Sequence, residues 1–217
     1  MVKFSGLNAM KCRQPGEPVA LSINLNKIAL LRNSRGGGNP SLLVAAQKCV
    51  AGGVQGLTLH WREDERHTKK KDVYDIKAYC DDVNVEFNLE GDGREEMIAL
   101  ALELCPTQFT LVPVSPGEIT SDHGWDLPKE SAYVKNIIQK INERGIRSAM
   151  FMDADPNKMD AALKTGVQRV ELYTEPYAAA YESADKDKKM TQLANTCLLY
   201  TSPSPRDATL SRMPSSA

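Results

Sequence analysis

Apolar and polar residues alternate along six short segments of the chain, and this period of two is typical of β-strands with one face on a core. The six segments are 20–26, 56–60, 84–90, 108–113, 147–153 and 169–173. Between them, apolar residues recur at helical spacing in 40–51, 70–80, 94–105, 131–145 and 156–166. Single helices between consecutive strands are typical of parallel βαβ units, so the pattern predicts an α/β fold.

Residues that begin and end helices support this prediction. Asp155 before Pro156 indicates a helix start, with Asp as the N-cap and Pro at the first helical position. Gly145 and Gly166 stand where a C-cap glycine ends a helix. A complete (β/α)₈ TIM barrel has eight βα units and typically ~250 residues. With about six units in 217 residues, the chain is predicted to be an incomplete TIM barrel.

The strands differ from ordinary parallel strands, which are apolar on both faces. Four of them have a polar face, made of Ser22, Asn24 and Asn26, of Thr58 and His60, of Asn84, Glu86, Asn88 and Glu90, and of Arg169, Glu171 and Tyr173. In a barrel the polar face points into the lumen, where its groups must bond to one another or to a ligand. Those at the C-terminal strand ends stand where barrel active sites are built. The alternative is an open sheet whose polar face lies in water.

The net charge and the hydropathy of the chain argue against several classes of partner. The net charge of −1 supplies no basic field for nucleic acid or an anionic membrane. Residues 1–20 contain no apolar signal segment, and no window approaches a membrane span. The five cysteines, none in a CxxC pair, are Cys12, Cys49, Cys80, Cys105 and Cys197. We interpret them as reduced thiols and expect a cytoplasmic protein.

His60 and Glu90 are the leading candidates for acid–base chemistry, because they end consecutive strands on the same polar face. A carboxyl group beside an imidazole gives two titratable groups whose pKa values can be moved toward neutrality, so that the pair supplies an acid and a base. The competing interpretation is a metal site. His60 and His67 are seven residues apart, His123 is the third histidine, and no HxH, HExxH or CxxC motif occurs. The sequence therefore indicates no metal.

Two segments after strands could bind an anion. Segment 61–72 has the composition of a solvated charge cluster, but Arg62 and His67 lie within one loop of the predicted barrel mouth, where an arginine could bind phosphate bidentately. Segment 31–40 places arginines before a glycine run, which suits either an anion-binding backbone or a mobile loop. Lys27 follows the first strand and could form a Schiff base if desolvated, or be an ordinary exposed lysine.

Several strings together resemble the pyridoxine 5′-phosphate synthase family, the ring-closing enzymes of vitamin B6 biosynthesis. The strings are SINLNKIALLRNSRGG, GLTLHWREDERH, FNLEGD, TLVPVSPGEITSDHGWD, FMDADP and RVELYTEPYA. The resemblance implies a (β/α)₈ barrel assembled as a homo-octamer. It also implies small phosphorylated substrates, because the family condenses 3-amino-2-oxopropyl phosphate with 1-deoxy-D-xylulose 5-phosphate. The product is pyridoxine 5′-phosphate, and no metal or organic cofactor is needed.

The resemblance implies a role for each matching residue. His60 in TLHWRED and Glu90 in FNLEGD match acid–base groups, and Glu171 in VELYTEPY matches a residue that stabilises charged intermediates. Asn24 matches a contact to the amino-ketone phosphate. The residues that match contacts to the pentulose phosphate are Arg35, Arg62, His67 and Thr120.

Two departures from the family pattern matter. Well-known members read Asn-x-Asp-His after strand one, whereas this chain has Asn26 and Lys27 in the last two positions, which weakens the implied substrate contacts of these two residues. Strands seven and eight, which in the family bring a third catalytic histidine and a phosphate-binding glycine-rich backbone, have no counterpart in the pattern.

We therefore expect three parts: an N-terminal extension over 1–18, a partial TIM barrel over 19–196, and a non-native or disordered tail over 197–217. The tail has three prolines, five serines and no periodicity. We hypothesise that it is translated sequencing adapter following a truncated gene, because 197–207 and 211–217 back-translate, with permitted codons, to two adapter pieces in the right order. DNA downstream of the Thr196 codon tests this, since a different codon choice across 197–207 would exclude it.

Two alternatives remain open at this point. The first is another phosphate-handling barrel enzyme, an epimerase or a Schiff-base aldolase that uses Lys27. The second is a non-catalytic, truncated barrel. For the chain by itself we expect poor solubility and no activity, because six strands leave two parallel edges unpaired.

Overall fold

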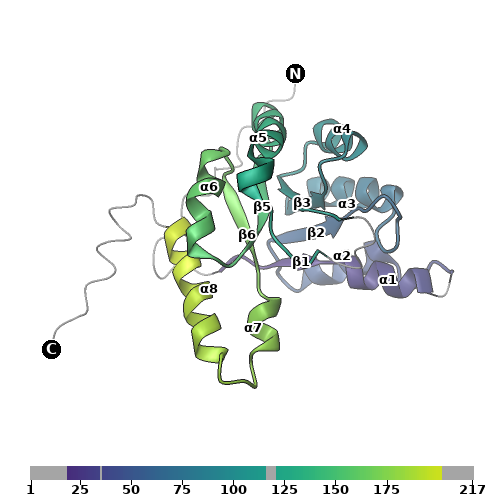
Figure 1. Ribbon diagram of the computed structural model, residues 1–217. Coiled ribbons are helices and arrows are strands. Elements are labelled where there is room, and N and C mark those ends of the chain that lie inside the picture. Colours follow the sequence, from purple (N-terminus) through teal and green to yellow (C-terminus); the bar gives the residue numbers. More distant parts are fainter. Residues whose placement is uncertain (1–18, 35, 116–120, 202–217) are drawn as a thin grey trace. The chain divides into compact units, whose positions relative to one another are not determined.

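The computed structural model describes residues 19–34, 36–115 and 121–201, the last four by their backbone alone. These residues form two compact units (Figure 1). Residues 20–153 and 160–173 make the larger unit, and the smaller one includes 154–159 and 174–201.

The larger unit contains all six described strands. They are β1 (Ser22–Asn24), β2 (Gly56–His60), β3 (Glu86–Gly91), β4 (Gln108–Leu111), β5 (Arg147–Asp153) and β6 (Arg169–Tyr173). The helices that alternate with them are α1 (Asn26–Ser34), α2 (Leu42–Ala51), α3 (Lys70–Val83), α4 (Glu95–Leu104), α5 (Leu127–Glu143) and α6 (Met159–Lys164). The order of strands in the sheet equals their order in the chain, and every neighbouring pair is parallel. The sheet curls into a half-barrel, so the predicted incomplete TIM barrel is confirmed.

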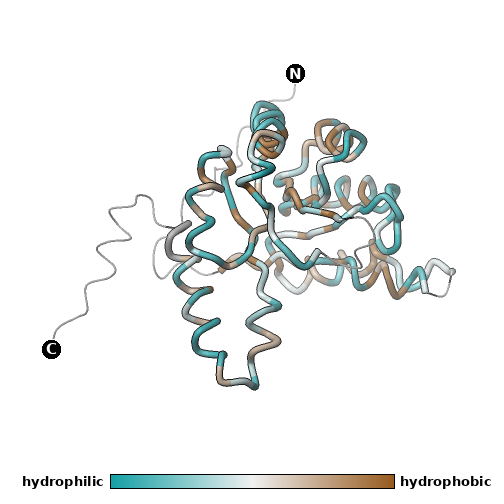
Figure 2. The backbone as a smooth tube through the Cα atoms, in the orientation of Figure 1, coloured by the Kyte–Doolittle hydropathy of each residue, from teal (hydrophilic) through white to brown (hydrophobic). Residues whose placement is uncertain are grey.

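The apolar face of the strands packs against the helices, as the period of two predicted. Leu57, Leu59, Phe87, Leu89 and Phe109 are at most 1% exposed. Their partners from the helices include Ile76, Cys80, Met97, Ile138 and Ile141, which are fully buried. Each such side chain contributes roughly 1.5–3 kcal/mol when it leaves water. Figure 2 shows the corresponding mixture of apolar and polar residues along the strands and helices.

The predicted helix ends are confirmed. The Asp155 side chain accepts a hydrogen bond from the Asn157 amide, 3.0 Å, at the start of a short 3₁₀ turn, η1 (Pro156–Lys158). Gly145 and Gly166 both have φ near +80°, the left-handed conformation that ends helices and favours glycine.

Helix α1 corrects one expectation, because residues 31–34 belong to a helix and not to a loop. The Asn24 side chain accepts a hydrogen bond from the Asn26 amide, 2.8 Å, and so starts the helix directly after β1. Its nine residues alternate apolar and polar too irregularly to show a clear helical stripe in the sequence.

The smaller unit contains η1 with two helices, α7 (Glu175–Ala179) and α8 (Lys186–Thr201). Helix α7 packs on α8, and the Lys186 Nζ atom lies 4.0 Å from the centre of the Tyr181 ring. Helix α8 continues past residue 197, so its end falls inside the segment predicted to be a tail. The predicted domain boundaries remain a prediction.

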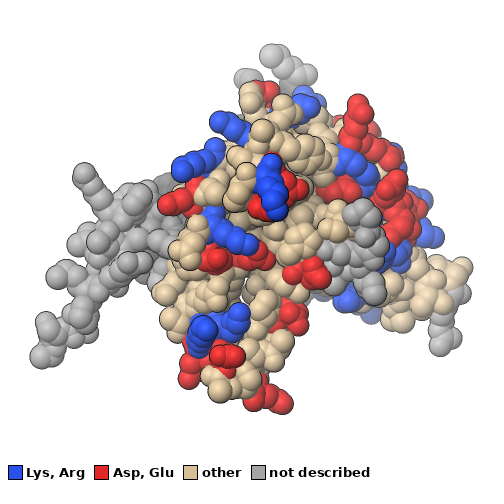
Figure 3. All heavy atoms as spheres, in the orientation of Figure 1, with Lys and Arg blue, Asp and Glu red and all other residues tan. Residues whose placement is uncertain are grey.

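Acidic and basic side chains are intermingled on the face in Figure 3. None of the helices described is both long enough and apolar enough to span a membrane.

Candidate active site

The polar face of the sheet is joined by a continuous set of hydrogen bonds. The Ser22 and Thr58 hydroxyls lie 3.0 Å apart, and the Asn88 amide donates to the Thr58 hydroxyl over 3.3 Å. Thr110 Oγ1 and Gln108 Nε2 both donate to Asn88 Oδ1, at 2.9 and 3.2 Å. The polar side chains therefore satisfy one another across β1 to β4, as a lumen-facing layer must.

His60 and Glu90 lie side by side at the carboxyl ends of their strands. They are register partners of the β2–β3 ladder, so their side chains share one face of the sheet. Asn24 Nδ2 donates to Glu90 Oε2 and Asn88 Nδ2 donates to Oε1, both over 3.4 Å. The sequence-predicted acid–base pair is thus brought together in space.

The surroundings of the Glu90 carboxyl group favour its neutral, protonated form. Burial raises the pKa of its carboxyl group well above its usual range, and the nearby negative charge of Glu171 raises it further. Burial also raises the pKa of Glu171. The two carboxyls belong to β3 and β6, three strands apart in the sheet, and they interact because the sheet curls.

His60 is held as a neutral base. Burial lowers its pKa to about 3, and repulsion from His67 in its protonated form, from Arg62 and from Arg94 acts in the same direction. Its Nε2 atom is buried and has no hydrogen-bond partner among the residues that the structure describes. Leaving such a group unpaired costs free energy, which a ligand could recover.

Arg62 and His67 approach this site from the loop between β2 and α3. Arg62 is 8% exposed, and its Nε atom lies 3.8 Å from Asp64 Oδ1. The His67 ring centre is 5.8 Å from that of His60. His67 Nδ1 accepts from the Thr68 amide, 2.8 Å, which requires the neutral ring with its proton on Nε2. Burial, followed by the Arg62 charge, accordingly lowers the pKa of His67.

Asn26 and Lys27 occupy different positions relative to the site. Asn26 Oδ1 accepts from the His60 amide, 2.9 Å, and from the Thr68 hydroxyl, 3.0 Å, so this oxygen is used to hold the backbone of the site. The Lys27 side chain is exposed. The structure thus provides no desolvation of the Lys27 amine, which the Schiff-base alternative requires.

Arg35 and Thr120, two predicted contacts to the pentulose phosphate, lie outside the described residues. Within the described part of the chain, no group of three His, Cys, Asp or Glu side chains is arranged to hold a metal ion.

Sequence reasoning missed Arg94. It precedes α4 in the loop after β3, its guanidinium lies 4.5 Å from the Trp61 ring centre, and it donates to Asp92 Oδ1 over 2.6 Å. Its Nε atom is buried without a partner among the described residues. The available signal was its position four residues after Glu90, in a βα loop at the end of the sheet where barrel sites are built.

A curled parallel sheet with titratable groups at the carboxyl ends of its strands defines the class of TIM-barrel enzymes. A family model described as "Pyridoxal phosphate biosynthesis protein PdxJ" matches residues 21–202. The chain belongs to this family, which confirms the resemblance seen in the sequence.

Curated relatives agree with the family match. Pyridoxine 5′-phosphate synthase of Bacteroides thetaiotaomicron is 46% identical over 161 residues, which cover 74% of this chain and 67% of the relative. The synthases of Parabacteroides distasonis and Mesorhizobium japonicum are 42% and 43% identical, and the matches cover 82% of this chain and 74% of each relative. The chain therefore spans about two thirds to three quarters of the length of the curated relatives that it matches.

Proposed function

We propose that this chain carries the acid–base site of a pyridoxine 5′-phosphate synthase. The reaction joins 3-amino-2-oxopropyl phosphate and 1-deoxy-D-xylulose 5-phosphate to give pyridoxine 5′-phosphate, inorganic phosphate and water. The observation that carries the proposal is the placement of His60 beside Glu90, where burial lowers the pKa of the imidazole and raises the pKa of the carboxyl group. Imine formation, loss of phosphate and ring closure each need a proton donor and a proton acceptor.

The electrostatics of the site suit phosphorylated substrates. The cationic groups that lower the pKa of His60 include Arg62 and Arg94. A phosphate dianion bound beside Arg62 and His67 offsets these charges, and so raises the pKa of His60 toward neutrality. His60 then becomes an effective base only when substrate is bound, while Glu90 supplies the acid.

The remaining predicted contacts complete this proposal. Asn24, which already donates to Glu90, binds the amino-ketone phosphate. Glu171 stabilises charged intermediates. Arg35 and Thr120 contact the pentulose phosphate together with Arg62 and His67. The proposed residues use no resident metal or organic cofactor, and we propose a cytoplasmic enzyme that assembles as the family's octamer.

Turnover by the 217-residue chain alone is proposed to be absent, because β1 and β6 are open edges of the described sheet. We therefore test binding and turnover separately. In the first experiment, calorimetry measures binding of 1-deoxy-D-xylulose 5-phosphate to the chain as it stands. Micromolar binding that is lost in Arg62→Gln supports the proposal, and the absence of binding to the unaltered chain contradicts it.

In the second experiment, the segment of this chain that matches the Bacteroides thetaiotaomicron synthase is joined to the C-terminal part of that synthase beyond the matched segment. Formation of pyridoxine 5′-phosphate is then measured with His60→Gln and His123→Gln as matched variants. We expect only the first to abolish turnover. Equal activity of the two variants would exclude the assigned role of His60.

A further inference from the structure

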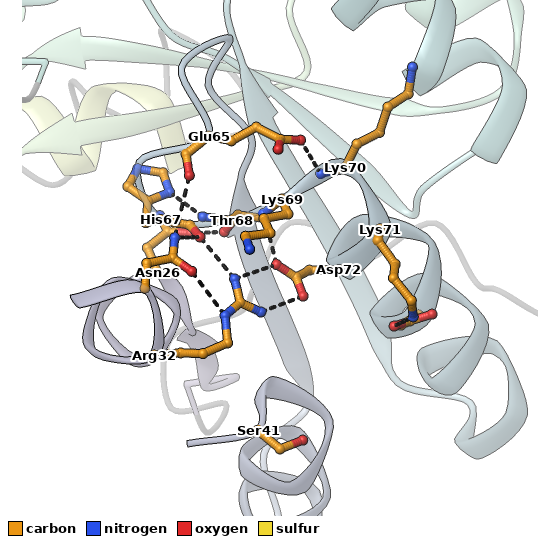
Figure 4. Close-up of polar contacts among 12 residues, drawn as sticks. Asn26, Arg32, Ser41, Glu65, His67, Thr68, Lys69, Lys70, Lys71 and Asp72 are labelled. Carbon is orange, nitrogen blue, oxygen red and sulfur yellow. Dashed lines mark hydrogen bonds and ion pairs between the residues drawn. The ribbon is translucent and has the colours of Figure 1, made fainter. Parts of the chain in front are cut away.

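The loop between β2 and α3 carries Arg62 and His67, yet it has no regular secondary structure of its own. A loop that positions binding groups must be held by other parts of the chain. Figure 4 shows that α1 and the start of α3 provide this support. The residues involved lie about 40 positions apart in the sequence and include none of the predicted site residues except Asn26 and His67.

Arg32 on α1 makes the central contact. Its Nη1 and Nη2 atoms donate to the two carboxylate oxygens of Asp72 on α3, at 2.6 and 2.9 Å (Figure 4). Nη2 also donates to the His67 carbonyl oxygen, 3.1 Å. The two side chains are only 10% and 11% exposed. This ion pair therefore uses the planar fork of arginine, which lysine cannot reproduce.

Asn33, the next residue of α1, acts on the same backbone. Its Nδ2 atom donates to the carbonyl oxygens of His67 and Arg66, at 2.7 and 3.1 Å. Its Oδ1 atom accepts from Arg32 Nε, 3.1 Å. The His67 carbonyl thus receives hydrogen bonds from two consecutive side chains of α1.

The residues after His67 are held by Asp72 and Asn26. Asp72 Oδ2 accepts from the Lys69 amide, 2.8 Å. Asn26 Oδ1 connects the Thr68 hydroxyl with the His60 amide. Every residue of segment 67–69 therefore makes a hydrogen bond to a side chain of α1 or α3. One of these side chains, Asn26, also accepts a hydrogen bond from the backbone amide of His60.

We propose that Arg32, Asn33 and Asp72 form a loop clamp, which sets the position of Arg62 and His67 relative to His60. Arg32 and Asp72 are positioning residues for binding of the phosphorylated substrate and touch no substrate themselves. The inference rests on the proposed function for the identity of that substrate, but not for the geometry of the loop.

The chain offers a matched control at the other end of the sheet. Arg147 on β5 donates to both carboxylate oxygens of Glu86 on β3, at 3.1 and 2.6 Å, and these side chains are 19% and 25% exposed. This second bidentate pair stands at the first residues of its strands, far along the sheet from His60, which ends β2. Arg147→Lys therefore disrupts the same kind of interaction without touching the loop.

The experiment compares Arg32→Lys with Arg147→Lys in the 217-residue chain. Backbone hydrogen exchange, followed by mass spectrometry without ligand, is expected to become about tenfold faster over 62–69 in Arg32→Lys alone. Exchange at the imidazole C2 positions is expected to show a His67 pKa closer to its ordinary value in that variant. Calorimetry with 1-deoxy-D-xylulose 5-phosphate is expected to show affinity about tenfold weaker, which corresponds to 1.4 kcal/mol.

The double variant Arg32→Gln with Asp72→Asn covers the case in which a single variant does not fold. It removes both buried charges together, so folding is retained while the loop remains loose. The clamp is refuted if either Arg32 variant shows unaltered exchange over 62–69, or if Arg147→Lys changes that segment equally. Failure of the unaltered chain to bind the sugar phosphate refutes the proposed function instead, because the exchange measurements contain no ligand.

Discussion

Each end of the polar face of the sheet contains basic and acidic side chains. Those at the N-terminal end form an ion pair, whereas those at the C-terminal end have shifted pKa values. At the N-terminal end, Arg147 is paired with both oxygens of Glu86 and also donates to Gln108 Oε1, 2.9 Å. At the C-terminal end, His60 has a buried nitrogen without a partner among the described residues, and Glu90 is pushed toward its neutral form. The side chains at the N-terminal end have their hydrogen-bond partners within the protein. At the C-terminal end, a ligand can supply the missing partner.

The same strands therefore contribute to stability at one end and to function at the other. A satisfied buried pair stabilises the fold as long as both partners are present. Titratable groups with displaced pKa values are found at functional sites more often than elsewhere, because catalysis needs them. Variants at the two ends are therefore expected to change different properties.

The largest effect is expected on turnover. In the enzyme completed with the relative's C-terminal part, Glu90→Gln is expected to lower kcat by at least ~100-fold, the usual scale for a general acid or base. The substituted side chain keeps the shape and loses the transferable proton. Steady-state rates of pyridoxine 5′-phosphate formation provide the measurement, and a rate within threefold of the unaltered enzyme would contradict the role.

The next effect is on stability and concerns the other end. Glu86→Gln leaves the partly buried Arg147 guanidinium without its carboxylate and is expected to cost about 2 kcal/mol. For a chain of this size that is roughly 4–8 °C in Tm. Thermal unfolding measures this loss, and kcat in the completed enzyme is expected to stay within twofold. A kcat that falls as steeply as in Glu90→Gln would remove the distinction between the two ends.

His60 is expected to make the protein sensitive to acid. Its folded-state pKa of about 3 lies below the ordinary value of 6.5, so the folded state binds fewer protons than the unfolded state in this window. The corresponding stability is present above pH 6.5 and is lost as pH falls toward 3. His60→Gln is expected to reduce the slope of unfolding free energy against pH by about 1 kcal/mol per pH unit between pH 6 and 4. Denaturant titrations at several pH values measure it.

Glu90 is expected to act in the opposite sense. Because its folded-state pKa is raised, the stability it contributes is present below its unfolded-state pKa and is lost as pH rises through the folded-state value. Glu90→Gln removes this loss, and at pH 8 it is expected to raise Tm relative to the unaltered protein. The increase in stability should disappear near pH 4.5. An increase that does not depend on pH would show that it comes from packing and not from the titration of Glu90.

Much of the fold followed from local pattern. The bounds of β2, β5 and β6 agree with the alternating segments 56–60, 147–153 and 169–173. The period of two also gave the shared face of His60 and Glu90, which the register of the sheet confirms. Helix α1 escaped detection because its start is marked by a hydrogen bond that the Asn24 side chain accepts from the Asn26 amide, and not by a regular apolar stripe.

Other features had no local signal. The contact of Arg32 with Asp72 joins residues 40 positions apart, and the effect of Glu171 on Glu90 spans strands that are not neighbours. Substrate binding by Asn26 stays a prediction, and the structure shows that its Oδ1 atom accepts a hydrogen bond from the His60 amide.

The sequence by itself determined which residues line the polar face and in what order the strands occur, because alternation and helix spacing are local properties of a chain. Only the tertiary structure decided how those residues behave chemically. The curvature of the sheet brings β3 and β6 near each other, and burial then fixes which protons are held. Desolvation and the distance between charges depend on the packing of the whole unit, so neither can be obtained from any one segment.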